Sequence, residues 1–185
     1  MSLTLITPPA AEPVSLAEAK AHLKVDSTDD DVLIASLITA ARARAEWHTG
    51  RALITQSWTL WLDAWPAGGV EIPLPPLQSV TSVTTYALDD MPRTLAPSTY
   101  QVDAASAPAR LTLKSGTLPP TDLRALNAVE IGFTAGYGAA SAVPAPVKQT
   151  ILQTVADLFV HRGDEAEIVS QTAQALLAPY RIFKL

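Results

Sequence analysis

The sequence predicts an α+β protein, a small helical bundle of about four helices with an antiparallel β module inserted between the N-terminal and C-terminal helices. Near both ends, apolar residues recur every three to four positions, which is typical of helices packed on one side. From Ala52 the chain becomes rich in Thr, Val, Ile, Trp and Tyr, and helical spacing returns after Pro144. The predicted organisation is one domain, 1–185, in which a helical frame (1–51 and 142–185) holds a β module (52–141).

Two helices are predicted before the β module. In "VSLAEAKAHLKV", Ser15 and Glu18 have the spacing of a capping box, which predicts a helix over 16–23. The next helix begins after an acidic cluster whose negative charge suits a helix N-terminus, and Gly50 marks its end. Its predicted apolar stripe consists of Ile34, Leu37, Ile38, Ala41 and Ala45.

The middle of the chain reads as about six strands separated by the turn signals "AWPAGG" and "DDMPR". Val129, Ile131 and Phe133 alternate with polar residues or glycine, as expected of a strand with one buried face. In "SWTLWL", Trp58 shares a face with the leucines, so Trp61 faces the other way. Trp61 is therefore either covered by the protein itself or an anchor at a subunit contact.

A long helix is predicted after Pro144, with Pro146 near its first turn and Gly163 at its end. Its predicted apolar stripe consists of Val147, Ile151, Val155, Leu158 and Phe159. The last segment, "SQTAQALLAPYRIFKL", predicts a short helix ended by Pro179 and an aromatic, basic tail.

The sequence contains no pattern typical of an enzyme. The glycines of "GFTAGYG" (132–138) are not followed by the Lys and Ser or Thr of a phosphate-binding loop, since the next lysine is Lys148. We interpret this stretch as a strand end and a loop. The chain has no cysteine, and its three histidines, near predicted helix ends, form no metal-binding motif. The acidic cluster at 26–31 lacks the spacing of a calcium loop. We therefore predict no catalytic residues, no cofactor and no metal.

Composition also limits the partners. Thirteen basic and eighteen acidic residues give a net charge of −5, and the tightest basic group, Arg42, Arg44 and Arg51, lies next to Glu46. A protein that grips DNA by its phosphates carries a basic face, so specific or tight DNA binding is not expected. Neither a signal peptide nor a membrane span is predicted. The absence of cysteine fits a reducing cytoplasm.

The order of these elements resembles the head–tail connector (adaptor) proteins of tailed phages, in the long form with a β module. The family pattern "sLaeaK.hL", then "DD..i..li.aAr...e..tgR.l..q.w", is matched by Leu16, Lys20, Leu23, Asp30, Asp31, Ile38, Ala41, Arg42, Gly50, Arg51, Gln56 and Trp58. The pattern "i.LP..Pl.sV.sv.Y" is matched by Ile72, Pro73, Leu74, Pro75, Pro76, Leu77, Val80, Val83 and Tyr86. The closing patterns, "f.aGyg....vP..vkqailllvahly..R" and "LL.pyR", are matched by Gly136, Tyr137, Pro144, Val147, Lys148, Arg162, Leu176, Leu177, Pro179, Tyr180 and Arg181.

The resemblance implies a structural part of a virion, used also by phage-like gene transfer agents and assembled in the bacterial cytoplasm. Such proteins form a homo-oligomeric ring, expected here to be a dodecamer, under the portal protein. The ring extends the DNA exit channel and links the head to a stopper or tail-completion protein. DNA would pass through without specific binding. A tail-completion or head-closure (stopper) protein of the same particle is the alternative.

The C-terminal tail is the predicted docking segment, because it combines apolar, aromatic and basic residues. We expect residues 176–185 to be displaced in the free subunit and to pack on the portal or on a neighbouring subunit. The alternative is that they fold back onto their own helical frame. The predicted interface residues are Leu176, Leu177, Tyr180, Arg181, Phe183 and Trp61.

Overall fold

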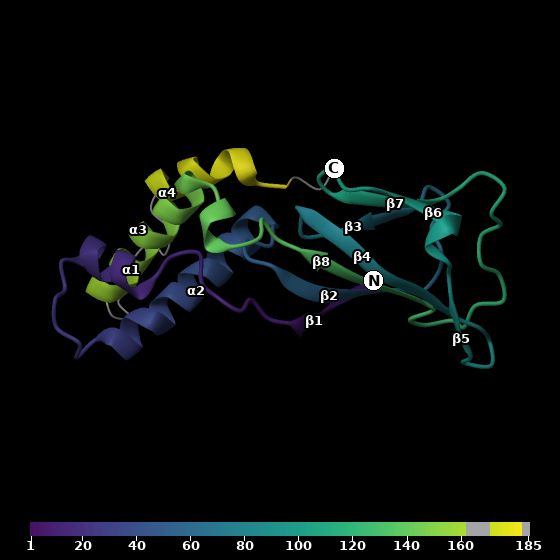
Figure 1. Ribbon diagram of the computed structural model, residues 1–185, viewed down its shortest axis with the longest axis horizontal. Helices are drawn as coiled ribbons and strands as arrows, with labels where there is room; N and C mark the ends of the chain where they lie inside the picture. The colour runs from purple at the N-terminus through teal and green to yellow at the C-terminus, as the bar shows by residue number, and fades with distance from the viewer. Residues whose placement is uncertain (162–170, 183–185) are drawn as a thin grey trace. The chain divides into compact units, whose positions relative to one another are not determined.

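The computed structural model describes residues 1–161 and 171–182 of the chain. Within them it has four α-helices and eight strands, all paired antiparallel, which confirms the α+β class and the number of helices (Figure 1). The chain divides into two compact units. The β unit comprises Met1–Pro9 and Thr55–Gly136, and the helical unit comprises Ala10–Ile54 and Tyr137–Leu185.

The helical unit is built from two segments far apart in sequence. Its helices are α1 (Leu16–Leu23), α2 (Asp31–Thr49), α3 (Ala145–His161) and α4 (Gln171–Leu177). The capping box before α1 is present, since the Glu18 N–H donates to the Ser15 hydroxyl and the Ser15 N–H donates to the Glu18 carboxylate. The Ser15 N–H and, as a second cause, the Ser15 hydroxyl both donate to the Glu18 carboxylate and lower its pKa. The predicted start and end of α1 are therefore confirmed.

The two halves of the helical unit share one core. On α2, Ile34 and Ile38 are buried together with Ala41 and Ala45, as the apolar stripe predicts. They belong to one cluster with Val147, Ile151 and Val155 of α3, while Leu37 and Phe159 pack partly buried at its edge. The predicted end of α3 at Gly163 lies outside the described residues.

The β unit contains two sheets. The five-stranded sheet has the order β1 (Ser2–Thr7), β2 (Gln56–Leu62), β8 (Val129–Ala135), β4 (Leu77–Tyr86) and β5 (Pro92–Thr94). The three-stranded sheet has the order β3 (Val70–Ile72), β7 (Ala109–Leu113) and β6 (Tyr100–Asp103).

One face of each sheet is buried. Leu60, Ile131 and Val83 lie opposite one another on β2, β8 and β4, and all are fully buried. The predicted alternation on β8 is confirmed, because Val129 and Phe133 are buried on the same face. Leu111 is the corresponding buried residue of the smaller sheet. Both sheets therefore contribute apolar side chains to the core of the β unit.

Two strands were not predicted. Residues 1–9 were expected in the helical frame, whereas β1 pairs with β2 and belongs to the β unit. Five of its six residues are exposed, so β1 lacks the alternating burial by which strands are recognised. The other missed strand, β5, has three exposed residues and overlaps the end of the stretch "DDMPR" that was interpreted as a turn.

The turn before β3 provides a test of the β unit. Gly69 has a φ of 89°, and a Cβ there would lie 2.8 Å from the Leu111 carbonyl oxygen and 2.6 Å from a Thr112 methyl group. We expect Gly69→Ala to lower the free energy of unfolding by about 1–3 kcal/mol, because β7 must move away. Denaturant unfolding measures this change. Gly68→Ala is the matched control: nothing lies within 4 Å of its Cβ, so a loss as large as that of Gly69→Ala would contradict the explanation.

Candidate assembly interface

The predicted docking tail lies against the helical unit as far as the structure describes it. Leu177 is 1% exposed and belongs to the helical core, against which Tyr180 packs partly buried. Leu176 is half-buried and Arg181 is exposed. Phe183 lies outside the described residues. Leu177 therefore serves the core of its own subunit.

Arg51 holds the tail in this position. Its Nε donates to the Tyr180 carbonyl oxygen at 2.6 Å, and the Ile182 N–H donates to the Thr49 carbonyl oxygen at 2.9 Å. Arg51 also hydrogen-bonds the Tyr137 hydroxyl. Burial is the largest influence on the pKa of Tyr137 and raises it, whereas Arg51 acts in the opposite direction. The expectation that the tail is displaced in the free subunit is wrong for residues 176–182.

Pro179 closely follows the end of α4 at Leu177, as the sequence predicts. It lies within a 3-10 turn, Ala178–Tyr180, that follows α4 directly. Proline is tolerated in the first turn of a helix because the N–H that it lacks would have no partner there. The tail therefore continues from α4 back towards the end of α2, where Thr49 and Arg51 bind it.

Trp61 belongs to a cluster on the face of the five-stranded sheet opposite Leu60. Its ring centroid lies 6.1 Å from that of Tyr86, and the Arg124 guanidinium lies 4.1 Å from the centroid of the Tyr86 ring. The Tyr86 hydroxyl donates to the Glu130 carboxylate, which raises the pKa of Tyr86. Trp, Tyr and Arg carry much of the energy of protein interfaces. We call these four half-buried residues, Trp61, Tyr86, Arg124 and Glu130, the Trp61 cluster.

Sequence reasoning found only Trp61 of this cluster. Tyr86 was matched as a family position and Glu130 as part of a strand, whereas Arg124 comes from an irregular segment without periodicity. The pairing of Trp61 with Glu130 across β2 and β8 brings the cluster together. No sequence spacing signals it.

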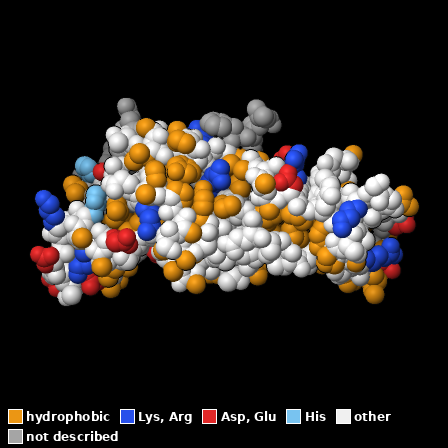
Figure 2. Space-filling model, turned by 45° about the horizontal axis from the view of Figure 1, so that its top comes forward, with side chains coloured by type: hydrophobic (Ala, Val, Ile, Leu, Met, Phe, Trp, Pro, Cys, Tyr) orange, Lys and Arg blue, Asp and Glu red, His pale blue; other side chains and the backbone are white. Residues whose placement is uncertain are grey.

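The basic group near the end of α2 does not form a basic patch. Arg42 contacts Glu12 at 2.7 Å and Glu46 at 2.6 Å. Arg51 makes a hydrogen bond to the tail, so Arg44 alone of the group has neither an ion pair nor a side-chain hydrogen bond among the described residues. Among the described side chains on the face shown in Figure 2, Lys and Arg are scattered and no continuous basic area is seen.

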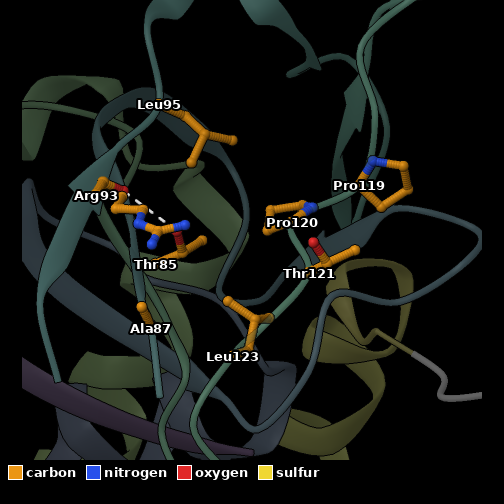
Figure 3. Close-up of a pocket in the computed structure, with 8 residues that line it drawn as sticks. All are labelled: Thr85, Ala87, Arg93, Leu95, Pro119, Pro120, Thr121 and Leu123. Atoms are coloured by element: carbon orange, nitrogen blue, oxygen red, sulfur yellow. Dashed lines mark hydrogen bonds between the residues drawn. The ribbon is translucent and has the colours of Figure 1, made fainter. Parts of the chain in front are cut away.

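The structure also shows no constellation typical of catalysis within the described residues. A hollow of about 290 Å³ in the β unit has Arg93 and Leu95 on one side and Pro119 and Pro120 on the other (Figure 3). Arg93 is the only titratable residue in its lining, and the one hydrogen bond drawn there joins the Thr85 hydroxyl to the Arg93 carbonyl oxygen. Such a lining offers no acid–base pair that could activate the hydroxyls of Thr85 and Thr121.

Of the residues described, no three His, Asp or Glu side chains are grouped so that they could hold a metal ion. In the stretch 132–138, Gly132 lies inside β8, and Gly136, with a φ of 122°, follows the strand end. The interpretation as a strand end and loop is confirmed. None of the helices described is long and apolar enough to span a membrane.

Comparison with known proteins gives a consistent result. The family model of phage gp6-like head-tail connector proteins matches residues 13–109. Chains of similar structure occur in the virion of a native gene transfer agent (GTA) particle (27% identity, TM-score 0.83) and in the neck of an empty GTA particle computed with C6 symmetry (26%, 0.83). A third occurs in the neck of a native GTA particle computed with C12 symmetry (28%, 0.81). Each match covers 100% of this chain and 97% of the other.

The comparison with curated proteins gave no match. The family match nevertheless spans just over half of the 185 residues, and the structural matches extend over both the helical unit and the β unit. This chain therefore belongs to the phage gp6-like head-tail connector protein family.

Proposed function

We propose that the protein is the structural head–tail connector in the neck of a tailed phage or a phage-like gene transfer agent. In this role it forms a ring under the portal protein, extends the DNA exit channel and links the head to the stopper or tail. The main support is the likeness, over its whole length, to chains of gene transfer agent particles, two of them from necks. That likeness includes the β unit and the C-terminal helices, which continue beyond the family match at residue 109.

The same likeness supports a ring of twelve copies. The necks with similar chains were computed with C12 and C6 symmetry, and a twelve-membered ring is compatible with both. The portal protein and a stopper or tail-completion protein are the expected neighbours above and below the ring. The role is mechanical, so no turnover and no cofactor are required.

We expect only weak contact with DNA. Arg42 and Arg51 are engaged within the protein and the net charge is −5, so clustered cations that would neutralise phosphates are few. Binding of a labelled duplex at physiological salt should have a dissociation constant weaker than about 1 μM. Submicromolar binding that weakens steeply with added salt would contradict a channel that lets DNA slide.

Electron microscopy of the particle neck tests the proposed role. Portal protein is mixed with the purified chain and imaged, with portal protein alone as the control. The expected result is an added collar of twelve subunits directly on the portal. If the chain binds only to portals that already carry another ring, the result would favour the alternative function, that of a stopper or tail-completion protein. A chain that adds no density would contradict both roles.

A further inference from the structure

The outward side of α2 is unusual for a surface helix. We define the α2 face by the following exposed residues, which lie opposite the buried stripe: Val32, Leu33, Ser36, Ala40, Ala43 and Trp47. None of them is charged. Val32 is 86% exposed and Trp47 is 82% exposed, so bulky apolar side chains stand at both ends of a row of small residues.

Charged residues of α2 lie at its ends or flanks. Asp31 pairs with Lys20 of α1, and Arg42 pairs with Glu12 and Glu46. A helix facing only water normally carries charged residues on its outward side. An exposed tryptophan on an uncharged surface is instead typical of the centre of a protein interface, because burying it removes apolar area from water without removing charges.

We propose that the α2 face is the surface by which one copy of this chain packs against the next copy in the ring. This inference rests on the proposed ring. In a cyclic assembly each copy touches two others through two different surfaces, so the α2 face meets another region of the neighbouring copy.

Charge favours a second copy as the occupant. Each copy has a net charge of −5, so copies repel one another unless they meet where no acidic side chain lies. The α2 face meets this condition. At its edge, Arg44 is half-buried and has no ion pair among the described residues, so it complements the acidic surface of a neighbour. DNA is a poor occupant, because one arginine provides little attraction for phosphates.

Photo-crosslinking identifies the occupant directly. The chain has no cysteine, so Ala43→Cys introduces a single thiol that can carry a benzophenone maleimide. After assembly on portal protein and illumination, we expect a product of two copies, about twice 19.6 kDa. Ala21→Cys, at an exposed position of α1, is the matched control and should give much less of it. A crosslinked product that contains portal protein instead of a second copy would overturn the proposal. Equal yields of the two-copy product from Ala43→Cys and Ala21→Cys would overturn it as well.

A substitution series separates this inference from the proposed function. Ala43→Glu places a carboxylate in the middle of the α2 face, and we expect ring formation to weaken about tenfold or more. Ala21→Glu should leave it unchanged, and both variants should melt like the parent chain because Ala and Glu are good helix formers. If the parent chain never joins the portal, the proposed function fails. Suppose instead that Ala43→Glu joins the portal normally and that the labelled Ala43→Cys variant gives no product of two copies. The proposed function then stands, and the role of the α2 face as the contact between copies is refuted.

Discussion

Leu177→Ala is expected to lower the free energy of unfolding by about 2–5 kcal/mol. Leu177 is 1% exposed and lies in the cluster that joins α2, α3 and α4. Removing its side chain takes apolar contacts away and leaves a cavity that the neighbouring helices fill only in part. Thermal or denaturant unfolding of the purified chain measures the loss.

The comparison with Leu176→Ala makes this test specific. Leu176 precedes Leu177 on the same helix but is only half-buried, so its loss should be clearly smaller. An unchanged melting temperature for Leu177→Ala, combined with failure to join the portal, would mean that Leu177 acts at an interface after all. Interface roles for Tyr180 and Arg181 stay a prediction, because both lie at or near the surface of the helical unit.

The second large effect is expected at Arg42. Its side chain is 12% exposed and joins Glu12 to Glu46, which is 14% exposed. Glu46 also accepts a hydrogen bond from the Leu53 N–H at 2.9 Å, so it holds the chain where it leaves the helical unit. These contacts connect the segment before α1, the middle of α2 and the segment after α2.

Arg42→Ala is therefore expected to cost about 2–4 kcal/mol of folding stability, because the partly buried carboxylates of Glu12 and Glu46 lose their contacts with the guanidinium. This expected loss lies near the lower end of the range for breaking a buried ion pair, because all three side chains retain some contact with water. Chemical denaturation gives the measurement.

Arg44→Ala is the matched control on the same helix. Arg44 is half-buried and has no ion pair among the described residues, so its removal should change the stability of the free subunit by no more than about 0.5 kcal/mol. Equal losses for the two arginines would show that side-chain packing on α2, and not the carboxylate contacts, accounts for the effect.

The helices of this protein were largely determined by local sequence. The Ser15–Glu18 capping box begins α1, Gly50 ends α2, and the 3.6-residue spacing of Ile34, Ile38 and Ala41 sets the buried side of α2. Each of these signals acts within a few residues, so it can be read from the chain directly. The alternation on β8 is local in the same way.

Other features were decided only by the tertiary structure. Strand β1 is stabilised by hydrogen bonds to β2, which lies fifty or more residues away along the chain, and most of β1 is exposed. Leu177 and residues 178–182 belong to a segment with the residue types of a docking site, yet they lie against their own helical unit, where Arg51 and Thr49 offer hydrogen bonds.

The candidate interfaces follow the same division. Trp61 was recognised by its residue type, but Arg124 joins it only because the fold brings an irregular segment beside Tyr86. The α2 face was not predicted, because the apolar spacing of a helix identifies only its buried side. The lack of charge on the opposite side indicates an interface only when the structure shows that this side is exposed. Local hydrogen bonds and periodicity are encoded in neighbouring residues, but burial depends on which distant segments cover a surface, and only the folded chain determines that.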